Sequence, residues 1–505
     1  MKQWDCIVVG AGITGLTVAR ILSQCGKSVL LLEKASILGG SLARFRVEGI
    51  PFDVGFHFTG GFNDEGNGVL DEILSLLGVR EQIRPIYFPR DACHRMLFPS
   101  EGINYAIPCG AAAVREKLKR DFPRHKDGLD RYFDRFQAVV DATPTLAVSG
   151  FDDFPVPLDD DRVSLQTVLD EYVPDRLLQT ILGGLCLCYG TSPREASFAT
   201  HCRVSFGLQD SLARTEDGGD AFVDALVDVL KKDRVDIRTR CTISQCADIT
   251  DRKAMRFVLS DGSEVGAGAC IFTMHPRSIL SILPKEHLSK AFQNRVQDFQ
   301  PSNGFFTVYG ALDQPPEAEA VTLASILPDM DLNDILTCRS PDPVDSAMMV
   351  LRSRERGAAG PVTTVTSLEV AFAESTAHWA QSTLKRRAPA YYEYKRQRTE
   401  SMVRRINEHV PECRGMRVID SASTLTYRDY LHSPDGSAYG IRQMMGQINL
   451  AGRLPINNLY CAGQSALLPG VLGGMTSAFF VSRSILGRNV FREYIAGKAC
   501  CSTVQ

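Results

Sequence analysis

Apolar and polar positions alternate in blocks at the start of the chain, and each block has the length of one secondary-structure element. Residues 5–10 form an apolar run, a glycine-rich loop follows, residues 16–26 have helical spacing, and residues 28–34 form a second apolar run. The order strand, helix, strand is the β-α-β unit of a parallel sheet. The pattern therefore predicts an α/β protein that begins with a Rossmann-like unit.

Three glycines, Gly10, Gly12 and Gly15, give the first loop the spacing G-x-G-x-x-G. In such a loop the glycines allow a tight turn, the close approach of a pyrophosphate and close packing of helix on strand, and the helix N-terminus faces the phosphates. Glu33 ends the second strand about 20 residues further on, where it can accept a hydrogen bond from a ribose hydroxyl. Together these features predict a dinucleotide site. We also assign to it Ile13, Thr14 and Lys34.

A second glycine-rich loop follows the acidic residue. Gly39 and Gly40 precede Arg44, an arrangement that suits another backbone approach to an extended ligand, with a cation for its phosphates. The alternative is an ordinary glycine turn with a solvated arginine.

The last part of the chain supplies another glycine-lined face. Residues 459–463 have a strand pattern, and we expect Gly473 and Gly474 to open a helix whose N-terminus stabilises an electron-rich ring or a phosphate. FAD is long enough to contact both faces. The glycines of 266–270 are not followed by a helix, so we expect no second dinucleotide site for a nicotinamide.

Two long segments, rich in proline and in apolar helical stretches, separate these parts and predict a second domain that covers the cofactor. The expected fold class is α/β, with a Rossmann-like FAD-binding domain and a discontinuous α+β substrate domain. We place the FAD-binding domain at 1–89, 205–275 and 411–490, the substrate domain at 90–204 and 276–410, and a C-terminal tail at 491–505.

The composition is that of an ordinary globular protein. A net charge of −3, without a basic tail, argues against nucleic acid as a partner. The sequence pattern shows neither a signal peptide nor a run long enough to span a membrane, so we expect a cytoplasmic protein. Fifteen cysteines without a C-x-x-C pair indicate reduced thiols and no metal site. The basic segment 383–405 indicates a solvated helix face, or else peripheral contact with the inner face of a membrane.

Several of these segments, in order and spacing, resemble the FAD-dependent superfamily of phytoene desaturases, carotenoid isomerases and retinol saturases. The motifs that carry the resemblance are GAGITGL, LLLEKASILGGSLARF, FDVGFHFTGG, GGDAFVDALVDVL and NNLYCAGQSALLPGVLGGM. FDVGFHFTGG and LTYRDYLHSPDGSAYGI are more similar to the carotenoid isomerase and retinol saturase branch. The resemblance implies a fold of the amine oxidase and phytoene desaturase type.

The resemblance also implies contacts along the whole length of FAD. Ser41 stands where an arginine is common in the family, and this leaves open which cation meets the phosphates. The implied contacts are Gly10, Gly12 and Gly15 with the pyrophosphate, Glu33 with the adenosine ribose, Gly40 and Arg44 beside the phosphates, Ile243 with adenine, and Gly463, Gly473, Gly474 and Met475 at the flavin end.

Two residues are candidates for catalysis. The resemblance places His57 between the flavin and the substrate tunnel, where an imidazole can give a proton to a carbon chain or take one from it. The equal alternative is an imidazole that only bonds a backbone carbonyl and shapes the pocket. Tyr439 can orient or protonate the substrate, although an aromatic wall for an apolar substrate is the favoured alternative.

The sequence thus predicts an FAD-dependent oxidoreductase that acts on carbon-carbon double bonds of a long apolar substrate, such as a polyene, a retinoid or an acyl chain. Saturation or isomerisation is favoured over desaturation. An amine oxidase and a non-catalytic, flavin-bearing lipid-binding subunit are the alternatives from other classes. Electrons are expected from a separate carrier or from NAD(P)H. Substrate identity, direction and oligomeric state stay open.

Overall fold

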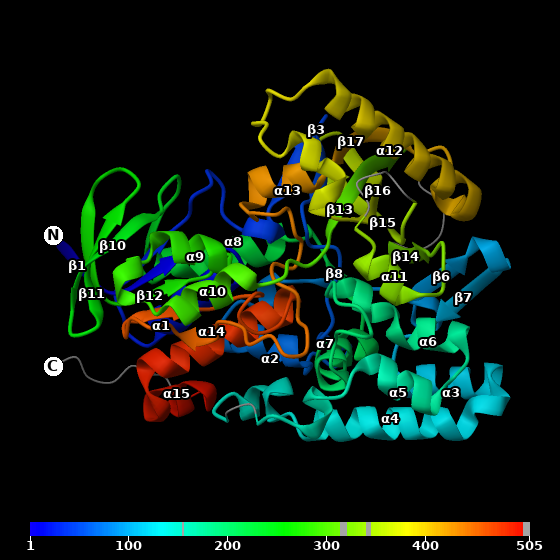
Figure 1. Ribbon diagram of the computed structural model, residues 1–505, viewed down its shortest axis with the longest axis horizontal. Helices are drawn as coiled ribbons and strands as arrows, with labels where there is room; N and C mark the ends of the chain where they lie inside the picture. The colour runs from blue at the N-terminus through cyan, green and yellow to red at the C-terminus, as the bar shows by residue number, and fades with distance from the viewer. Residues whose placement is uncertain (154–155, 314–320, 340–344, 498–505) are drawn as a thin grey trace.

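Two sheets dominate the computed structural model, which describes residues 1–153, 156–313, 321–339 and 345–497. In Figure 1 the first sheet lies at the left, near the N-terminus, and the second lies at the upper right beneath α12 (Pro389–His409).

The first sheet draws its strands from both ends of the chain. Its order is β10-β11-β12-β1-β2-β9, with β19 on β12 and β18 on β19. β1 pairs in parallel with β2 and β12, and β12 pairs in parallel with β19. These described strands are β1 (Lys2–Val9), β2 (Val29–Leu32), β9 (Asp236–Arg238), β10 (Ile243–Thr250), β11 (Lys253–Leu259), β12 (Glu264–Phe272), β18 (Gly452–Arg453) and β19 (Leu459–Cys461).

Helices cover both faces of this sheet, because its central strands are apolar on both sides. All four residues of β2 are buried. One face packs against α1 (Ile13–Gln24), α8 (Asp220–Lys232) and α14 (Gly470–Leu486). The other packs against α9 (Pro276–Ile282) and α10 (Lys290–Asp298). The predicted Rossmann-like unit is confirmed.

The second sheet has the order β17-β13-β16-β15-β14-β6-β7 and is antiparallel except where β14 meets β6. One face packs on α12, and the other faces helices of the segment between residues 111 and 210. Its described strands are β6 (His94–Phe98), β7 (Ile103–Ile107), β13 (Gly304–Leu312), β14 (Val321–Ile326), β15 (Met348–Gly357), β16 (Gly360–Ala371) and β17 (Arg417–Ala422).

Shorter elements complete the chain. The chain also forms two antiparallel two-stranded ribbons. One pairs β3 (Arg44–Val47) with β4 (Ile50–Asp53), and the other pairs β5 (Pro85–Tyr87) with β8 (Ala213–Thr215). Along the sequence, these strands come between strands of the first sheet and strands of the second. The remaining α-helices of the described residues are α2 (Val69–Leu76), α3 (Ala111–Asp121), α4 (Lys126–Asp141), α5 (Leu165–Tyr172), α6 (Arg176–Gly183), α7 (Phe198–Asp210), α11 (Leu332–Thr337), α13 (Thr424–Leu431) and α15 (Arg488–Ile495).

The division into domains stays a prediction, but β17 bears on its last boundary. β17 follows residue 410, where we expect the third part of the FAD-binding domain to begin, yet it pairs with β13 of the second sheet. This pairing favours a boundary beyond β17. The expected tail begins within α15, and residues 498–505, with Cys500 and Cys501, lie outside the described residues.

The second predicted helix N-terminus is displaced by one turn. α14 begins at Gly470, so Gly473 and Gly474 do not open it and lie inside it. A Cβ on Gly474 would lie 3.0 Å from Oγ1 of Thr14, and one on Gly473 would lie 2.3 Å from the carbonyl oxygen of Leu468. The pair therefore allows α14 to pack closely against α1 and its own preceding loop.

A buried ionic cluster joins the two ribbons to the second sheet. Arg44 and Arg214 lie between the carboxylates of Asp53 and Glu355, and each of the four side chains is only 4% exposed. The backbone N–H of Gly219 also donates to Asp53, at 2.8 Å. Because the four charges come from β3, β4, β8 and β15, the cluster fixes these segments relative to one another.

The basic segment 383–405 lies largely in α12, and much of its charge is neutralised within the chain. Arg398 and Arg405 pair with the buried Glu369 of β16, and Arg396 pairs with acidic residues of its own helix. No helix of the described residues has the length and apolar composition needed to cross a bilayer.

Replacing Gly15 by alanine should destabilise the protein by about 2–3 kcal/mol, because added atoms cannot enter a packed backbone contact without a shift. A Cβ at this position would lie 1.8 Å from the carbonyl oxygen of Gly10. Urea denaturation of the protein without added ligand measures the change. The control is Gly207→Ala in α7, where the nearest atoms are 3.6 Å away and helix propensity favours alanine by about 1 kcal/mol. Equal effects of the two variants would contradict the packing role of Gly15.

Replacing Arg214 by methionine should lower the free energy of unfolding by about 3–5 kcal/mol, because the change leaves buried carboxylates without a full set of cations. Arg356→Met removes an ion pair with Glu216 whose arginine is 70% exposed, and should change stability by less than about 1 kcal/mol. Denaturant titration of both variants tests the difference. A loss of similar size in both would contradict the role assigned to the buried cluster.

Candidate active site

The carboxyl ends of the parallel strands meet at one edge of the first sheet. Val9 pairs with both Leu32 and Phe272, and Phe272 pairs with Cys461. The residues that follow these strands, Gly10, Glu33 and Ala462 among them, therefore lie together although the sequence separates them widely. In open α/β sheets this edge is where ligands bind.

Two helix N-termini face this edge. The N-cap residues are Gly12 for α1 and Pro469 for α14, so no side chain caps the first turn of either helix. The hydroxyl of Thr14 donates to the carbonyl oxygen of Gly474, at 3.1 Å, which holds the two helices together. Free backbone N–H groups and the positive end of the helix dipole suit an anionic or electron-rich ligand.

The two glycine-rich loops lie against each other. Gly12 and Gly39 form an isolated parallel bridge, and a Cβ on Gly40 would lie 3.3 Å from Cα of Gly12. Gly39 has φ of 112°, a conformation that glycine adopts far more readily than other residues. The double glycine thus permits the loop after β2 to meet the loop after β1.

Two backbone N–H groups hold the side chain of Glu33 in place at the end of β2. Its carboxylate oxygens accept from the N–H groups of Ala11 and Ala35, each at 2.8 Å, and the residue is 8% exposed. A carboxylate oxygen has more than one acceptor position, so capacity remains for a hydroxyl in the cavity. Ile243 lies nearby, because the N–H of Cys241 donates to the carbonyl oxygen of Glu33.

Most of the predicted site residues line one cavity of about 1150 Å³. It exceeds the roughly 300–1,000 Å³ of common ligand pockets, which leaves room for a dinucleotide and a substrate together. The predicted residues in its wall are Gly10, Gly12, Ile13, Thr14, Glu33, Lys34, Gly40, Ser41, Arg44, His57, Ile243, Tyr439, Gly463 and Gly474. Those outside its wall are Gly15, Gly39, Gly473 and Met475.

Arg44 has a partner other than the one expected. Its guanidinium pairs with Asp53 and Glu355, so its charge is already balanced inside the protein. The sequence could not reveal this, because Glu355 follows more than three hundred residues later. Among the described residues that line the cavity, Lys34 is a second cationic side chain, and it is exposed.

The remainder of the cavity is an apolar chamber between the second sheet and helices α6 and α7. Tyr309, together with Met96, Phe305, Leu368 and Val370, forms its sheet side. Its helix side is formed by Ile181, Leu182, Leu185, Leu187, Val204 and Leu208. Such a surface suits a ligand that is apolar along most of its length.

His57 lines this cavity without a hydrogen-bond partner. Both ring nitrogens are buried, and neither has a partner among the described residues, so the bond to a backbone carbonyl that the alternative invokes is not formed. The choice between a catalytic and a pocket-shaping role stays a prediction. Burial and then the charge of Arg214 lower its pKa to about 3. Arg214 also donates to the carbonyl oxygens of Phe56 and His57, at 3.4 and 3.3 Å. The imidazole is therefore neutral near pH 7. The hydrogen bonds from Arg214 fix the backbone that carries it.

Tyr439 lines the cavity with its ring. Its hydroxyl donates to the carbonyl oxygen of Leu187 at 3.2 Å, and its ring packs edge-on against Phe305 with centroids 6.0 Å apart. Since the hydroxyl already has a partner, this geometry supports the aromatic-wall interpretation over proton donation.

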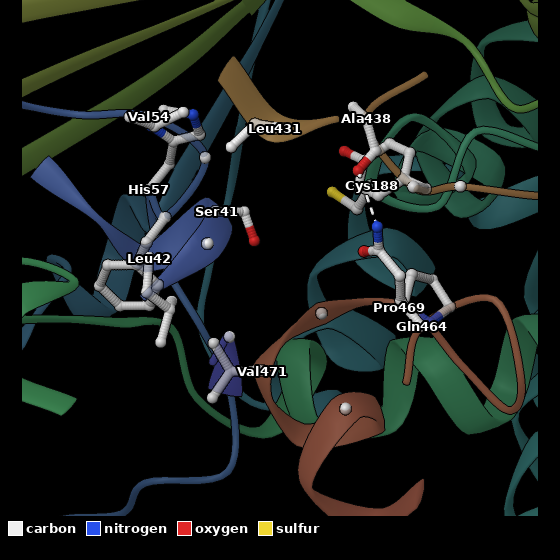
Figure 2. Close-up of a pocket in the computed structure, with 18 of the residues that line it drawn as sticks. Ser41, Leu42, Val54, His57, Cys188, Leu431, Ala438, Gln464, Pro469 and Val471 are labelled. Atoms are coloured by element: carbon white, nitrogen blue, oxygen red, sulfur yellow. Dashed lines mark hydrogen bonds between the residues drawn. The ribbon is translucent and has the colours of Figure 1, made fainter. Parts of the chain in front are cut away.

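Figure 2 shows the middle of the cavity. Ser41 and His57 lie on one side and Cys188 and Ala438 on the other, with open space between them. The amide of Gln464 donates to the carbonyl oxygen of Ala438 at 3.2 Å, the contact drawn as a dashed line.

Sequence reasoning missed several polar residues of the cavity wall. His275 caps α9 through Nδ1, while its buried Nε2 has no partner among the described residues. His94, Gln209 and Ser325 also line the cavity. His94 begins β6, whose burial pattern does not alternate, and nothing in the sequence relates it to Ser325.

The comparisons with known proteins agree with this geometry. A family model described as an NAD(P)-binding Rossmann-like domain matches residues 8–73. All-trans-retinol 13,14-reductase of Danio rerio is 23% identical over 97% of this chain and 87% of its own length. Chloroplastic prolycopene isomerase of Daucus carota is 28% identical over 30% of this chain and 24% of its own length.

Solved structures support the fold. Cyclohexylamine oxidase of Brevibacterium oxydans has a TM-score of 0.60 and 16% identity, over 95% of this chain and 98% of its own. The predicted amine oxidase type of fold is confirmed. The family model indicates a dinucleotide-binding unit at residues 8–73. The resemblance that the motifs indicate agrees with these matches: the chain is similar to a retinol 13,14-reductase over nearly its whole length and to a prolycopene isomerase over less than a third of it.

Proposed function

We propose that this protein binds FAD and acts on a carbon-carbon double bond of a long apolar substrate, by saturation or by cis-trans isomerisation. The observation that carries the proposal is the single cavity of about 1150 Å³, which connects the glycine-lined edge of the first sheet with the apolar chamber. A cofactor at the edge and an apolar chain in the chamber would share one enclosed space.

The residues present fit FAD. Two uncapped helix N-termini and two glycine loops suit a pyrophosphate, and Glu33 retains acceptor capacity for a ribose hydroxyl. Lys34 supports charge balance at the phosphates in place of Arg44. When bound, the flavin supplies hydride transfer.

The chain itself supplies position, exclusion of water and one proton-transfer group. The chamber walls hold the substrate by apolar contact, and Arg214 holds the backbone of His57 at the cavity wall. Neutral His57 has two unpartnered nitrogens, one a donor and one an acceptor. Its donor nitrogen can give a proton to a substrate carbon while its acceptor nitrogen takes one up from water, so that the imidazole stays neutral. Saturation needs both a hydride and a proton, and isomerisation needs no net change in electrons.

The relatives favour saturation. The reductase from Danio rerio aligns with nearly the whole chain, whereas the isomerase from Daucus carota aligns with less than a third of it. Electrons would come from a separate carrier or from NAD(P)H. Amine oxidation is the second candidate, because cyclohexylamine oxidase shares the fold. Residues 462–474, beside the flavin end, contain no aromatic side chain that could cage an amine.

Anaerobic titration of the flavin-loaded protein tests the proposal. After reduction with dithionite, all-trans-retinol should reoxidise the flavin and gain the mass of two hydrogen atoms, because a saturase transfers hydride to the double bond. Absorbance and product mass are the readouts, and cyclohexylamine added to the oxidised protein is the matched control. Bleaching by the amine alone would favour amine oxidation. Failure to retain or reconstitute any flavin would overturn the proposal.

His57→Gln should lower turnover by about 100-fold or more, the usual range for removal of a proton-transfer group, whereas Tyr439→Phe should cost less than about tenfold. Because the pKa of His57 is lowered to about 3, and burial lowers those of His94 and His275 to about 4, the wild-type rate should be flat from about pH 5 to 8. The rate should fall only below that pH range, where His57 gains a proton and loses its acceptor nitrogen. An inflection near pH 6.5 that His57→Gln removes would contradict this assignment.

A further inference from the structure

Two hydrogen-bonded polar side chains interrupt the apolar wall of the chamber. Nε2 of His94 lies 2.8 Å from Oγ of Ser325, and both residues line the cavity. His94 begins β6 and Ser325 lies in β14, which are neighbouring parallel strands of the second sheet. The pair therefore belongs to a rigid part of the fold.

The strand pattern shows that both side chains point into the chamber. Side chains alternate between the two faces of a strand, so His94 shares a face with Met96, and Ser325 with Leu323. Met96 and Leu323 line the cavity, whereas Ala324 packs in the cluster on the opposite face, against α12. A serine and a histidine thus occupy positions where the neighbouring residues of this face are apolar.

A third polar side chain lies on the helix side of the chamber, next to the same apolar cluster. Gln209 of α7 lines the cavity, and its Oε1 is buried with no hydrogen-bond partner among the described residues. Cys93, Leu208 and Leu323, the sequence neighbours of these polar residues, pack in one apolar cluster. A separate observation, an unsatisfied buried acceptor, therefore points to the same region as the paired His94 and Ser325.

Buried polar groups in an apolar wall are unfavourable unless a partner satisfies them. With Nε2 of His94 on Ser325, Nδ1 is left to donate or to accept, according to the tautomer. Burial, and to a lesser extent the charge of Arg95, lower the pKa of His94 to about 4, so the imidazole is neutral near pH 7. Arg95 pairs with Glu412, so its charge is balanced elsewhere. A carboxylate at this point would lack a cation, whereas a hydroxyl can both donate and accept.

We propose that His94 and Ser325, with Gln209, bind a hydroxyl group carried by the otherwise apolar substrate. This inference rests on the proposed function and names its substrate class: long-chain alcohols, in preference to the corresponding hydrocarbons and carboxylic acids. His94 and Ser325 then determine specificity, while the chamber walls bind the apolar chain.

Binding of three matched probes to the flavin-loaded protein tests the inference. The probes are all-trans-retinol, its hydrocarbon analogue with hydrogen in place of the hydroxyl, and all-trans-retinoic acid, with affinity measured by quenching of tryptophan fluorescence. Wild-type protein should bind the alcohol about tenfold more tightly than the hydrocarbon, the effect of one or two satisfied buried hydrogen bonds. Binding of the acid should be weaker than that of the alcohol.

Ser325→Ala should reduce the preference for the alcohol to about threefold or less, and His94→Phe should abolish it, because each change removes hydrogen-bonding capacity from the wall. The Kd of the hydrocarbon should stay unchanged in Ser325→Ala, which shows that the chamber is intact. Ser278→Ala, in the cavity wall on α9, is the control and should keep the full preference.

Three outcomes would overturn the inference. Equal affinity of wild-type protein for alcohol and hydrocarbon would remove the hydroxyl site but leave the proposed function standing. Equal weakening of alcohol and hydrocarbon by Ser325→Ala would mean that the pair only shapes the wall. Saturable binding of none of the probes to a protein that retains its flavin would overturn the substrate class and the hydroxyl site together.

Discussion

The balance of four buried charges underlies the arrangement of this protein. Arg44, Arg214, Asp53 and Glu355 come from four separate strands, and none of them is more than 4% exposed. Charges this deeply buried are tolerable only when each has opposite charges and hydrogen bonds around it. These charges therefore hold the ribbons β3–β4 and β5–β8 in one fixed position against the second sheet. This in turn fixes the loop after β4, which carries His57.

The cavity follows from this junction. The glycine edge belongs to the first sheet and the apolar wall to the second, so neither sheet alone encloses the space between them. Arg214 takes part in both the ionic cluster and the cavity wall. It balances the charges of Asp53 and Glu355, and it also donates a hydrogen bond to the carbonyl oxygen of His57. One side chain thus connects the electrostatics of the junction to the position of the candidate proton-transfer group.

Local sequence was informative where function depends on spacing along the chain. The glycines at 10, 12 and 15, the acid at 33 and the strand-helix-strand pattern around them predicted the first sheet and its ligand edge, and the structure agrees. His57 is a candidate from the sequence because it lies among glycines, and it lines the cavity.

Prediction was weaker where function depends on contacts between distant residues. The ionic partner of Arg44 and the pairing of His94 with Ser325 join residues that lie hundreds of positions apart. The glycine pair at 473 and 474 was assigned to a helix N-terminus, but its small size serves the close packing of α14 on α1. A glycine has the same letter in both roles, and only the packed structure distinguishes them.

The pairing of β19 with β12 has a consequence for how the chain folds during synthesis. The ligand edge combines residues 10–33 with residues 459–474, so its two halves are separated by most of the polypeptide. Contacts between such distant segments form slowly, and a nascent chain exposes unpaired strand edges until they form. β12 keeps an open edge at its carboxyl end until β19 has been made. The last strands of the first sheet are therefore a natural point for chaperones to act and for truncated products to aggregate.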